Sequence, residues 1–143
     1  MNNNLTLRRL QKDYFELKNS EVPLVGVSAA PEENDMKVWH INVRAPDFSP
    51  WKGGIFHMII TFPNNYPACP PTIISQTKFT HPNAFPDRRG LRICLEQLEK
   101  QPDDGSRWYE GWQSCYTVES ILIQLQSFFG EKKSEFMEKE QLV

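Results

Sequence analysis

Residues 80–98 read THPNAFPDRRGLRICLEQL, and they join a His-Pro-Asn tripeptide, a turn and an apolar run that contains a cysteine. The tripeptide is His81-Pro82-Asn83, and the cysteine is Cys94. A free cysteine in an apolar run is usually a small buried hydrophobe. However, a thiolate that attacks a carbonyl carbon needs a donor for the oxyanion that forms, and a side-chain amide can be that donor. Because Asn83 lies one loop before Cys94, the stretch indicates cysteine chemistry rather than packing alone.

The same residues resemble the catalytic segment of the ubiquitin-conjugating enzymes, in which His-Pro-Asn precedes a turn with glycine and then an apolar-Cys-Leu run. Here the turn contains Gly90, and the run is Ile93-Cys94-Leu95. Gly53-Gly54, a proline-rich segment at 62–71 and a tryptophan followed by a helix extend the resemblance over residues 7–129. The resemblance implies an α+β fold with an N-terminal helix, a four-stranded antiparallel meander, the active-site segment and a central helix.

Members of this family accept ubiquitin or a ubiquitin-like protein from an activating enzyme as a cysteine thioester, and pass it to a lysine or to a ligase cysteine. The resemblance therefore implies that Cys94 carries the modifier and that no cofactor is needed. It implies that Asn83 stabilises the oxyanion or stiffens the loop that does so, and that His81 and Pro82 support the site structurally. The turn from Asn83 to Cys94, which contains residues 85–89, is somewhat longer than in the commonest members of the family.

The composition is that of an ordinary soluble domain of 143 residues, with 39% hydrophobic and 24% charged residues. The net charge of −2 gives no reason to expect nucleic acid or an anionic membrane as a partner. No apolar run approaches the roughly 20 residues of a membrane span, and the first residues lack the apolar core of a signal peptide. We expect one core domain over residues 1–130 and a polar tail over residues 131–143.

The three cysteines, Cys69, Cys94 and Cys115, are an odd number and have no close spacing. Free thiols of this kind suit a reducing compartment. We therefore expect a cytoplasmic protein, with the nucleus as a second location. Neither the cysteines nor the three histidines fall at metal-ligand spacings, so no metal site is expected.

Residues 6–18 are expected to form the first helix, with Thr6 as its N-cap. Apolar side chains repeat at helical spacing along one face, and a basic group falls on the other side: Arg8, Arg9 and Lys12. A basic stripe is most simply a solvated helix face. The family resemblance implies, more specifically, that this stripe binds the activating enzyme.

Strand-like runs follow at residues 22–27, 37–44, 55–62 and 72–77. The short turns between them favour an antiparallel meander with a helix over one face. His40 and His57 fall on the more polar faces of their strands. We expect both histidines to be partly exposed residues of the sheet.

The segment 62–71 contains four prolines and is expected to be a stiff surface loop, because proline cannot sit inside a sheet. The resemblance implies that this loop and a second one after Trp112 bind ubiquitin ligases. Many ligase-binding members have a bulky aromatic where this chain has Ala68, and often Ser-Pro-Ala in the second loop. The positions implied in ligase binding are Pro67, Ala68, Ser114 and Cys115.

Residues 96–111 form an acidic insertion after Cys94. The insertion is either an ordinary solvated loop or a device that orients the incoming lysine or gates access to Cys94. Residues 117–129 are expected to form the central helix, with Thr117 as its cap. In the tail, Glu135 is the nearest candidate for the carboxylate that positions the lysine in some relatives.

Two other functions fit parts of the sequence. A catalytically silent scaffold of the same fold is favoured by the altered ligase loops, but the retention of Cys94 and of the tripeptide opposes it. A cysteine hydrolase needs a histidine paired with the nucleophile. Only His81 is near Cys94 in sequence, and its place before Pro82 suits a structural role better.

Overall fold

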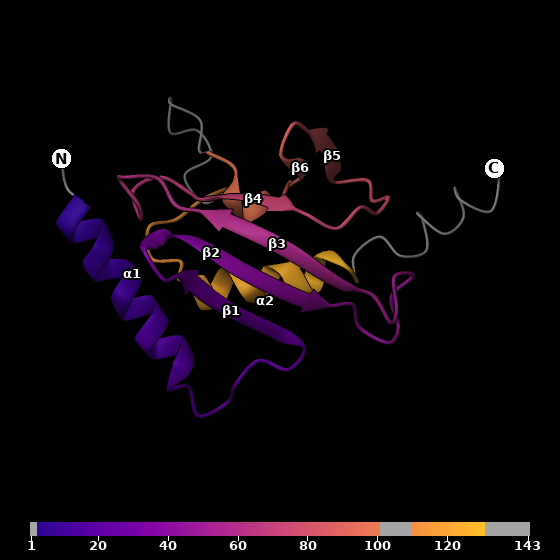
Figure 1. Cartoon of the computed structure of the whole chain (residues 1–143), viewed down its shortest axis with the longest axis horizontal. Helices are drawn as coiled ribbons and strands as arrows, with labels where there is room; N and C mark the ends of the chain where they lie inside the picture. Colours follow the sequence, from indigo (N-terminus) through magenta and orange to yellow (C-terminus); the bar gives the residue numbers. More distant parts are fainter. Residues whose placement is uncertain (1–2, 101–109, 131–143) are drawn as a thin grey trace.

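The computed structural model describes residues 3–100 and 110–130 (Figure 1). Residues 101–109 of the acidic insertion and the tail at 131–143, with Glu135, lie outside the described residues. Within the described ranges the elements are, in chain order, α1 (Asn3–Lys18), β1 (Val27–Glu32), β2 (Asp35–Arg44), β3 (Ile55–Thr61), β4 (Thr72–Ser75), β5 (Ala84–Asp87), β6 (Gly90–Ile93), a 3-10 turn (Glu96–Leu98) and α2 (Val118–Phe128).

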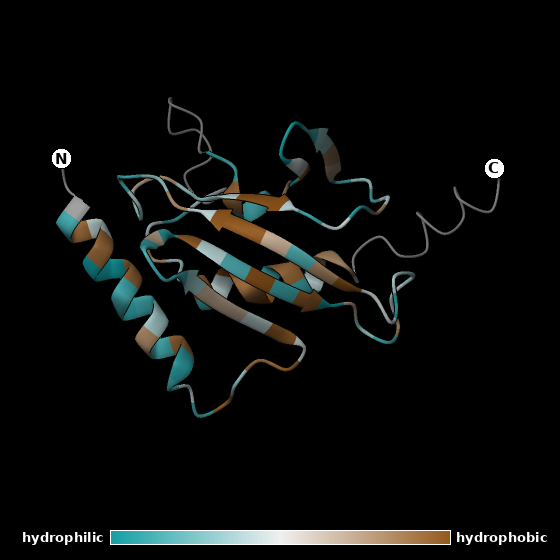
Figure 2. Ribbon diagram, in the orientation of Figure 1, coloured by the Kyte–Doolittle hydropathy of each residue, from teal (hydrophilic) through white to brown (hydrophobic). Residues whose placement is uncertain are grey.

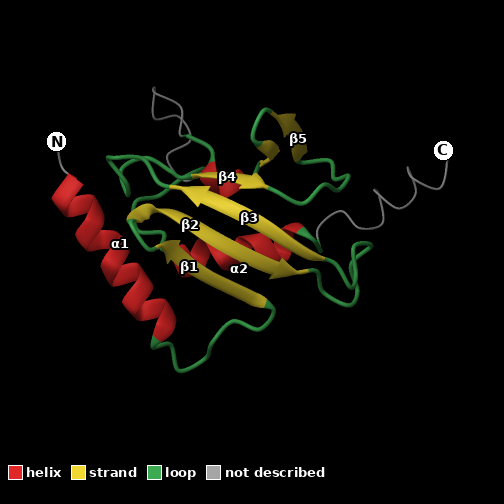
Figure 3. Cartoon of the chain, viewed as in Figure 1, coloured by secondary structure: helices red, strands yellow, loops and turns green. Residues whose placement is uncertain are grey.

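The strands form one sheet in the order β1-β2-β3-β4-β6-β5, and every neighbouring pair is antiparallel. Helix α2 lies across one face of this sheet, and α1 lies beside its edge (Figure 3). The expected meander is confirmed as β1 to β4. Sequence reasoning missed the hairpin β5–β6, which extends the sheet at the active-site segment.

The first strand was expected at 22–27, and this prediction is wrong. Strand β1 begins at Val27, and Val22 and Val25 are 80% and 86% exposed. Pro23 has no N–H for a ladder, and Gly26 turns the chain at a φ of 82°. The regular pairing with β2 therefore starts only after Gly26.

The hairpin β5–β6 depends on Gly90, the first residue of β6. Its φ is 147°, and a Cβ atom built there would lie 2.2 Å from the carbonyl oxygen of Ser75. Only glycine permits this approach of the hairpin to β4. Pro86 is tolerated because β5 is the edge strand of the sheet.

The core lies between the sheet and α2. Hydropathy alternates along β2 (Figure 2), and the strand expected at 37–44 is confirmed there, with Trp39, Ile41 and Val43 all fully buried. The apolar face of α2 meets them with Val118, Ile121, Leu122, Leu125 and Phe128. The predicted cap is also confirmed: the Thr117 hydroxyl accepts from the Ser120 N–H in a capping box.

Helix α1 begins at Asn3, so Thr6 lies inside the helix and is not its N-cap. Thr6 is instead buried, and its hydroxyl lies 2.6 Å and 2.9 Å from the carbonyl oxygens of Asn64 and Tyr66. The hydroxyl thus fastens the helix to the proline-rich loop. No helix within residues 3–100 and 110–130 is long and apolar enough to cross a membrane.

Asp13 is a buried carboxylate that the sequence pattern did not reveal, only 2% exposed. Its oxygens accept from Arg9 Nε at 3.1 Å, from the Tyr66 hydroxyl at 2.9 Å and from the Val118 N–H at 3.3 Å. Burial, and next the charge of Asp13, raise the pKa of Tyr66 well above its ordinary value. The phenol therefore stays a hydrogen-bond donor, and the cluster joins α1, the proline-rich loop and α2.

Candidate active site

Cys94 directly follows β6, and its side chain is half-buried. Strand alternation explains this position: the neighbours Ile93 and Leu95 are only 5% and 6% exposed, and the side chain between them points the other way. The thiol lines a hollow of about 230 Å³ with Asn83, Leu95, Glu96, Gln97, Glu99, Gln124 and Phe128. The apolar run therefore packs its two flanking side chains and leaves the cysteine accessible.

Asn83 and Cys94 lie at the same hollow because a hydrogen bond joins their backbones. The Cys94 N–H donates to the Asn83 carbonyl oxygen at 2.9 Å. The Asn83 N–H in turn donates to His81 Nδ1 at 2.9 Å. The structure thus brings together the two residues that the sequence suggested for chemistry.

His81 is 6% exposed and lies in a stack of aromatic rings. Its ring centre is 3.7 Å from that of Phe128 and 4.9 Å from that of Trp51. Because Nδ1 accepts from Asn83, the ring proton is on Nε2, which donates to the Phe128 carbonyl oxygen at 2.9 Å. Both ring nitrogens are hydrogen-bonded to backbone groups, so His81 is not placed as the base that a cysteine hydrolase requires.

Arg92 is a residue at this site that sequence reasoning missed. Its Nη1 donates to Cys94 Sγ at 3.0 Å. The two-residue spacing between Arg92 and Cys94 could have indicated this contact, because residues two apart in a strand share a face. It was overlooked because the segment was expected to be a turn and not a strand.

The two expected ligase loops also lie together. Ala68 and Ser114 line one hollow of about 290 Å³, and the Trp112 indole N–H donates to the Pro67 carbonyl oxygen at 2.7 Å. Ala68, Ser114 and Cys115 are exposed. The fold therefore joins the two loops, which are far apart in sequence, into one surface.

The basic stripe on α1 is only partly as expected. Arg8 and Lys12 are exposed, but Arg9 is not on the solvent side. In addition to its bond to Asp13, Arg9 donates from Nη2 to the Tyr116 carbonyl oxygen at 2.8 Å. Buried acceptors at the junction of the two helices draw its guanidinium inward.

The histidines of the sheet are half-buried, as expected, and contact each other. His40 Nδ1 lies 3.1 Å from His57 Nε2, and His40 Nε2 lies 3.0 Å from a Glu32 oxygen. Within residues 3–100 and 110–130, no group of three or more His, Cys, Asp or Glu side chains has the geometry of a metal site.

The exposed hairpin carries one perturbed carboxylate. The side chain and backbone of Arg89 donate to Asp87 and lower the pKa of this carboxyl to about 2. The pair is on the surface, beside the active-site strand β6. It fixes the turn between β5 and β6 without taking part in the hollow at Cys94.

Comparison with known proteins gives one family. The family model described as "Ubiquitin-conjugating enzyme" matches residues 9–141. The "Ubiquitin-conjugating enzyme E2-18 kDa" of Schizosaccharomyces pombe is 32% identical over 139 residues, which are 94% of this chain and 81% of that protein. The "Ubiquitin-conjugating enzyme E2 13" of Arabidopsis thaliana is 33% identical over 130 residues, 88% of this chain and 75% of that protein.

A solved structure shows the same relationship. The structure of human ubiquitin-conjugating enzyme E2 G1 matches with a TM-score of 0.71 and 30% identity, over 85% of this chain and 92% of that chain. The fold and the matches together define a transferase of the ubiquitin system. The chain belongs to the ubiquitin-conjugating enzyme family.

Proposed function

We propose that Cys94 is the residue that carries the modifier, as a thioester accepted from an activating enzyme. The observation that supports this most is the position of its sulfur, which lines an open hollow beside Asn83 although both sequence neighbours are buried. Attack of a thiolate on a thioester needs little assistance, because the leaving group is also a thiolate. The site accordingly needs no base beside Cys94 for loading.

Transfer to a lysine is the harder step, because the attacking amine must be neutral and the oxyanion that forms must be stabilised. We propose Asn83 as a donor to that oxyanion, or as the residue that stiffens the loop around it. The loop is already fixed by His81 on one side and by Cys94 on the other. Loss of one oxyanion donor typically slows a reaction by about 100- to 1000-fold.

The acidic insertion contributes to the same hollow. Glu96 and Glu99 line it together with Gln124 of α2. Their carboxylates attract an approaching lysine ammonium group. We propose that this part of the insertion orients the lysine acceptor.

Partner binding follows the family pattern. We propose that Arg8 and Lys12 of α1 contact the activating enzyme. The guanidinium of Arg9 is hydrogen-bonded to Asp13 and Tyr116, so we propose that Arg9 contributes only by shaping the helix surface. The surface formed by Pro67, Ala68, Ser114 and Cys115 is proposed for a ligase. The proposed modifier is ubiquitin or a ubiquitin-like protein, and the proposed location is the cytoplasm, with the nucleus second.

The test is a loading assay with activating enzyme, ATP and a panel of purified modifiers. We expect an adduct that reducing agent removes, that Cys94→Ala lacks and that becomes resistant to reducing agent in Cys94→Ser. Cys69→Ala and Cys115→Ala are the matched controls, since both residues are cysteines of the same chain, and both variants should load normally. An adduct that persists in Cys94→Ala, or no adduct with any modifier, would refute the proposal.

A further inference from the structure

The guanidinium of Arg92 is placed at the reacting atom. Arg92 lies in β6 and Cys94 two residues later, so both side chains leave the strand on the same face. The resulting contact joins Nη1 and Sγ at 3.0 Å. A charged donor at this distance forms a charge-assisted hydrogen bond whenever the sulfur carries negative charge.

Phe85 holds that guanidinium in place. Phe85 and Arg92 are directly paired across β5 and β6. The central carbon of the guanidinium lies 5.5 Å from the centre of the Phe85 ring, which is within the range of a cation–π contact. Strand β5 thus supplies an aromatic surface for Arg92.

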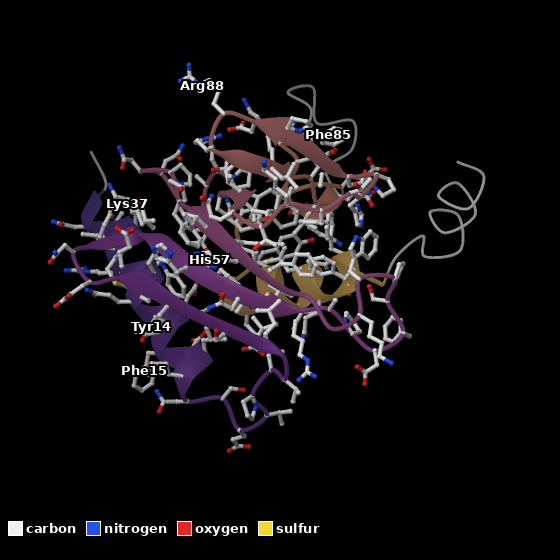
Figure 4. The ribbon with its side chains drawn as sticks, turned by 45° about the vertical axis from the view of Figure 1, so that its right-hand side comes forward. Tyr14, Phe15, Lys37, His57, Phe85 and Arg88 are labelled. Carbon is white, nitrogen blue, oxygen red and sulfur yellow. The ribbon has the colours of Figure 1, made fainter. Side chains whose placement is uncertain are left out.

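The other arginines of the hairpin are placed differently. Arg89 is paired with Asp87 at 3.0 Å. Arg88 is exposed and points away from the molecule at the hairpin tip, whereas Phe85 lies on the hairpin itself (Figure 4). The hairpin therefore offers a matched comparison between an arginine at the sulfur and one directed into solvent.

We propose that Arg92 is a catalytic residue of the transfer step and that Phe85 positions it; this inference rests on the proposed role of Cys94 as the thioester site. The amine nitrogen attacks the thioester carbon and forms the C–N bond, while the carbonyl electron pair moves to oxygen. When the intermediate collapses, the carbonyl re-forms, the C–S bond breaks and its electron pair passes to Sγ. The amine proton leaves to water, and Arg92 donates to the departing thiolate.

The same contact acts in the reverse sense during loading. The Cys94 thiolate attacks the incoming thioester, a C–S bond forms, and the activating enzyme departs as a thiolate. Arg92 then orients the attacking sulfur toward the hollow shared with Asn83. Because Arg92 is exposed, solvent and salt screen its charge, so we expect about a tenfold effect on transfer, smaller than that of an enclosed oxyanion donor.

The experiment measures single-turnover discharge of preloaded protein to free lysine over a range of lysine concentrations. We expect Arg92→Gln to lower the maximal rate about tenfold with little change in the half-saturating lysine concentration. Arg92→Lys should restore part of the rate, because it keeps a charged donor. Arg88→Gln, the matched control at the hairpin tip, should discharge like the wild type.

Phe85 is tested in the same assay. Phe85→Ala should give an intermediate rate, and Phe85→Tyr, which keeps the aromatic surface, should behave like the wild type. Rising salt concentration should reduce the difference in maximal discharge rate between the wild type and Arg92→Gln. Equal maximal rates for these two proteins, both loaded and equally stable to heat, would overturn the inference and leave the thioester proposal intact. If the wild type forms no thiol-sensitive adduct, it is the thioester proposal that fails.

Discussion

Helix α2 is held at its two ends by buried polar groups of different kinds. At the first turn, the Asp13 carboxylate accepts from the Val118 N–H. At the last turn, neutral His81 donates to the Phe128 carbonyl oxygen. Each group satisfies a backbone atom that has no partner within the helix, and each has the polarity that suits the helix dipole at its end.

The two ends differ in what else they hold. Asp13 connects α2 to Arg9 and Tyr66, so its bonds stabilise the packing of the two helices and the proline-rich loop. His81 connects α2 to Asn83 and so to the hollow at Cys94. The comparison indicates that one anchor serves the fold and the other serves the fold and the site. Substitutions at the two ends should therefore separate stability from transfer.

Removing the charged anchor should have the largest effect. Asp13→Ala leaves the Tyr66 hydroxyl and the Val118 N–H without their buried acceptor, and breaking such a group typically costs about 3 kcal/mol or more. We expect a correspondingly lower urea midpoint in equilibrium unfolding. Discharge of preloaded protein at low temperature should be unchanged, because Asp13 lies at the end of α2 away from Cys94.

The control for this prediction is Glu16→Ala. Glu16 is an exposed carboxylate on the same helix, paired with Lys12 at 3.7 Å. Its loss should change the unfolding free energy by less than about 0.5 kcal/mol. A discharge rate that falls together with stability in Asp13→Ala would remove the distinction between the two ends of α2.

Substitution of the neutral anchor should lower both stability and the discharge rate. His81→Phe keeps a ring between Trp51 and Phe128 but removes the bonds to Asn83 and to the Phe128 carbonyl. We expect a loss of about 1–3 kcal/mol, because one buried acceptor is left unsatisfied. The discharge rate should fall as well, since the Asn83 loop loses its anchor.

His81→Ala extends this test because it removes the ring as well. Its unfolding free energy should drop further than that of His81→Phe, by about the 0.5–1.5 kcal/mol that an aromatic pair contributes. Its discharge rate should match that of His81→Phe. Normal discharge by His81→Phe would show instead that stacking alone keeps the active-site loop in place.

The two anchors also mark what the sequence could reveal. His81 was assigned a structural role because Pro82 and Asn83 follow it, and local neighbours provide its partners in part. Asp13 was not anticipated because its partner Tyr66 lies 53 residues away in the chain. A carboxylate at a buried helix position is recognised only when its distant donors are known.

The strands show the same division between local and distant information. The alternation in β2 and β3 predicted which side chains face the core, because that pattern is a property of a single strand. The docking of the hairpin β5–β6 on β4 was not predicted, because it depends on the close approach of Gly90 to Ser75, which is distant in the sequence. With the hairpin missed, Arg92 could not be placed beside Cys94.

The smallest effect is expected from an exposed pair, in contrast to the two buried anchors. Arg89 lowers the pKa of Asp87 from 3.8 to about 2. The pair therefore stabilises the folded hairpin above pH 3.8, and this contribution is lost as the pH falls toward 2.

NMR titration of the Asp87 carboxyl carbon should show a midpoint near 2 in the wild type and in Arg88→Gln, but a higher one in Arg89→Gln. Because the pair lies at the surface and is screened by solvent, Asp87→Asn should lower stability at neutral pH only slightly and leave discharge from Cys94 almost unchanged. A large loss of stability or of discharge in Asp87→Asn would mean that the turn between β5 and β6 also controls the geometry at the sulfur, in addition to Arg92 and Phe85 in the strands.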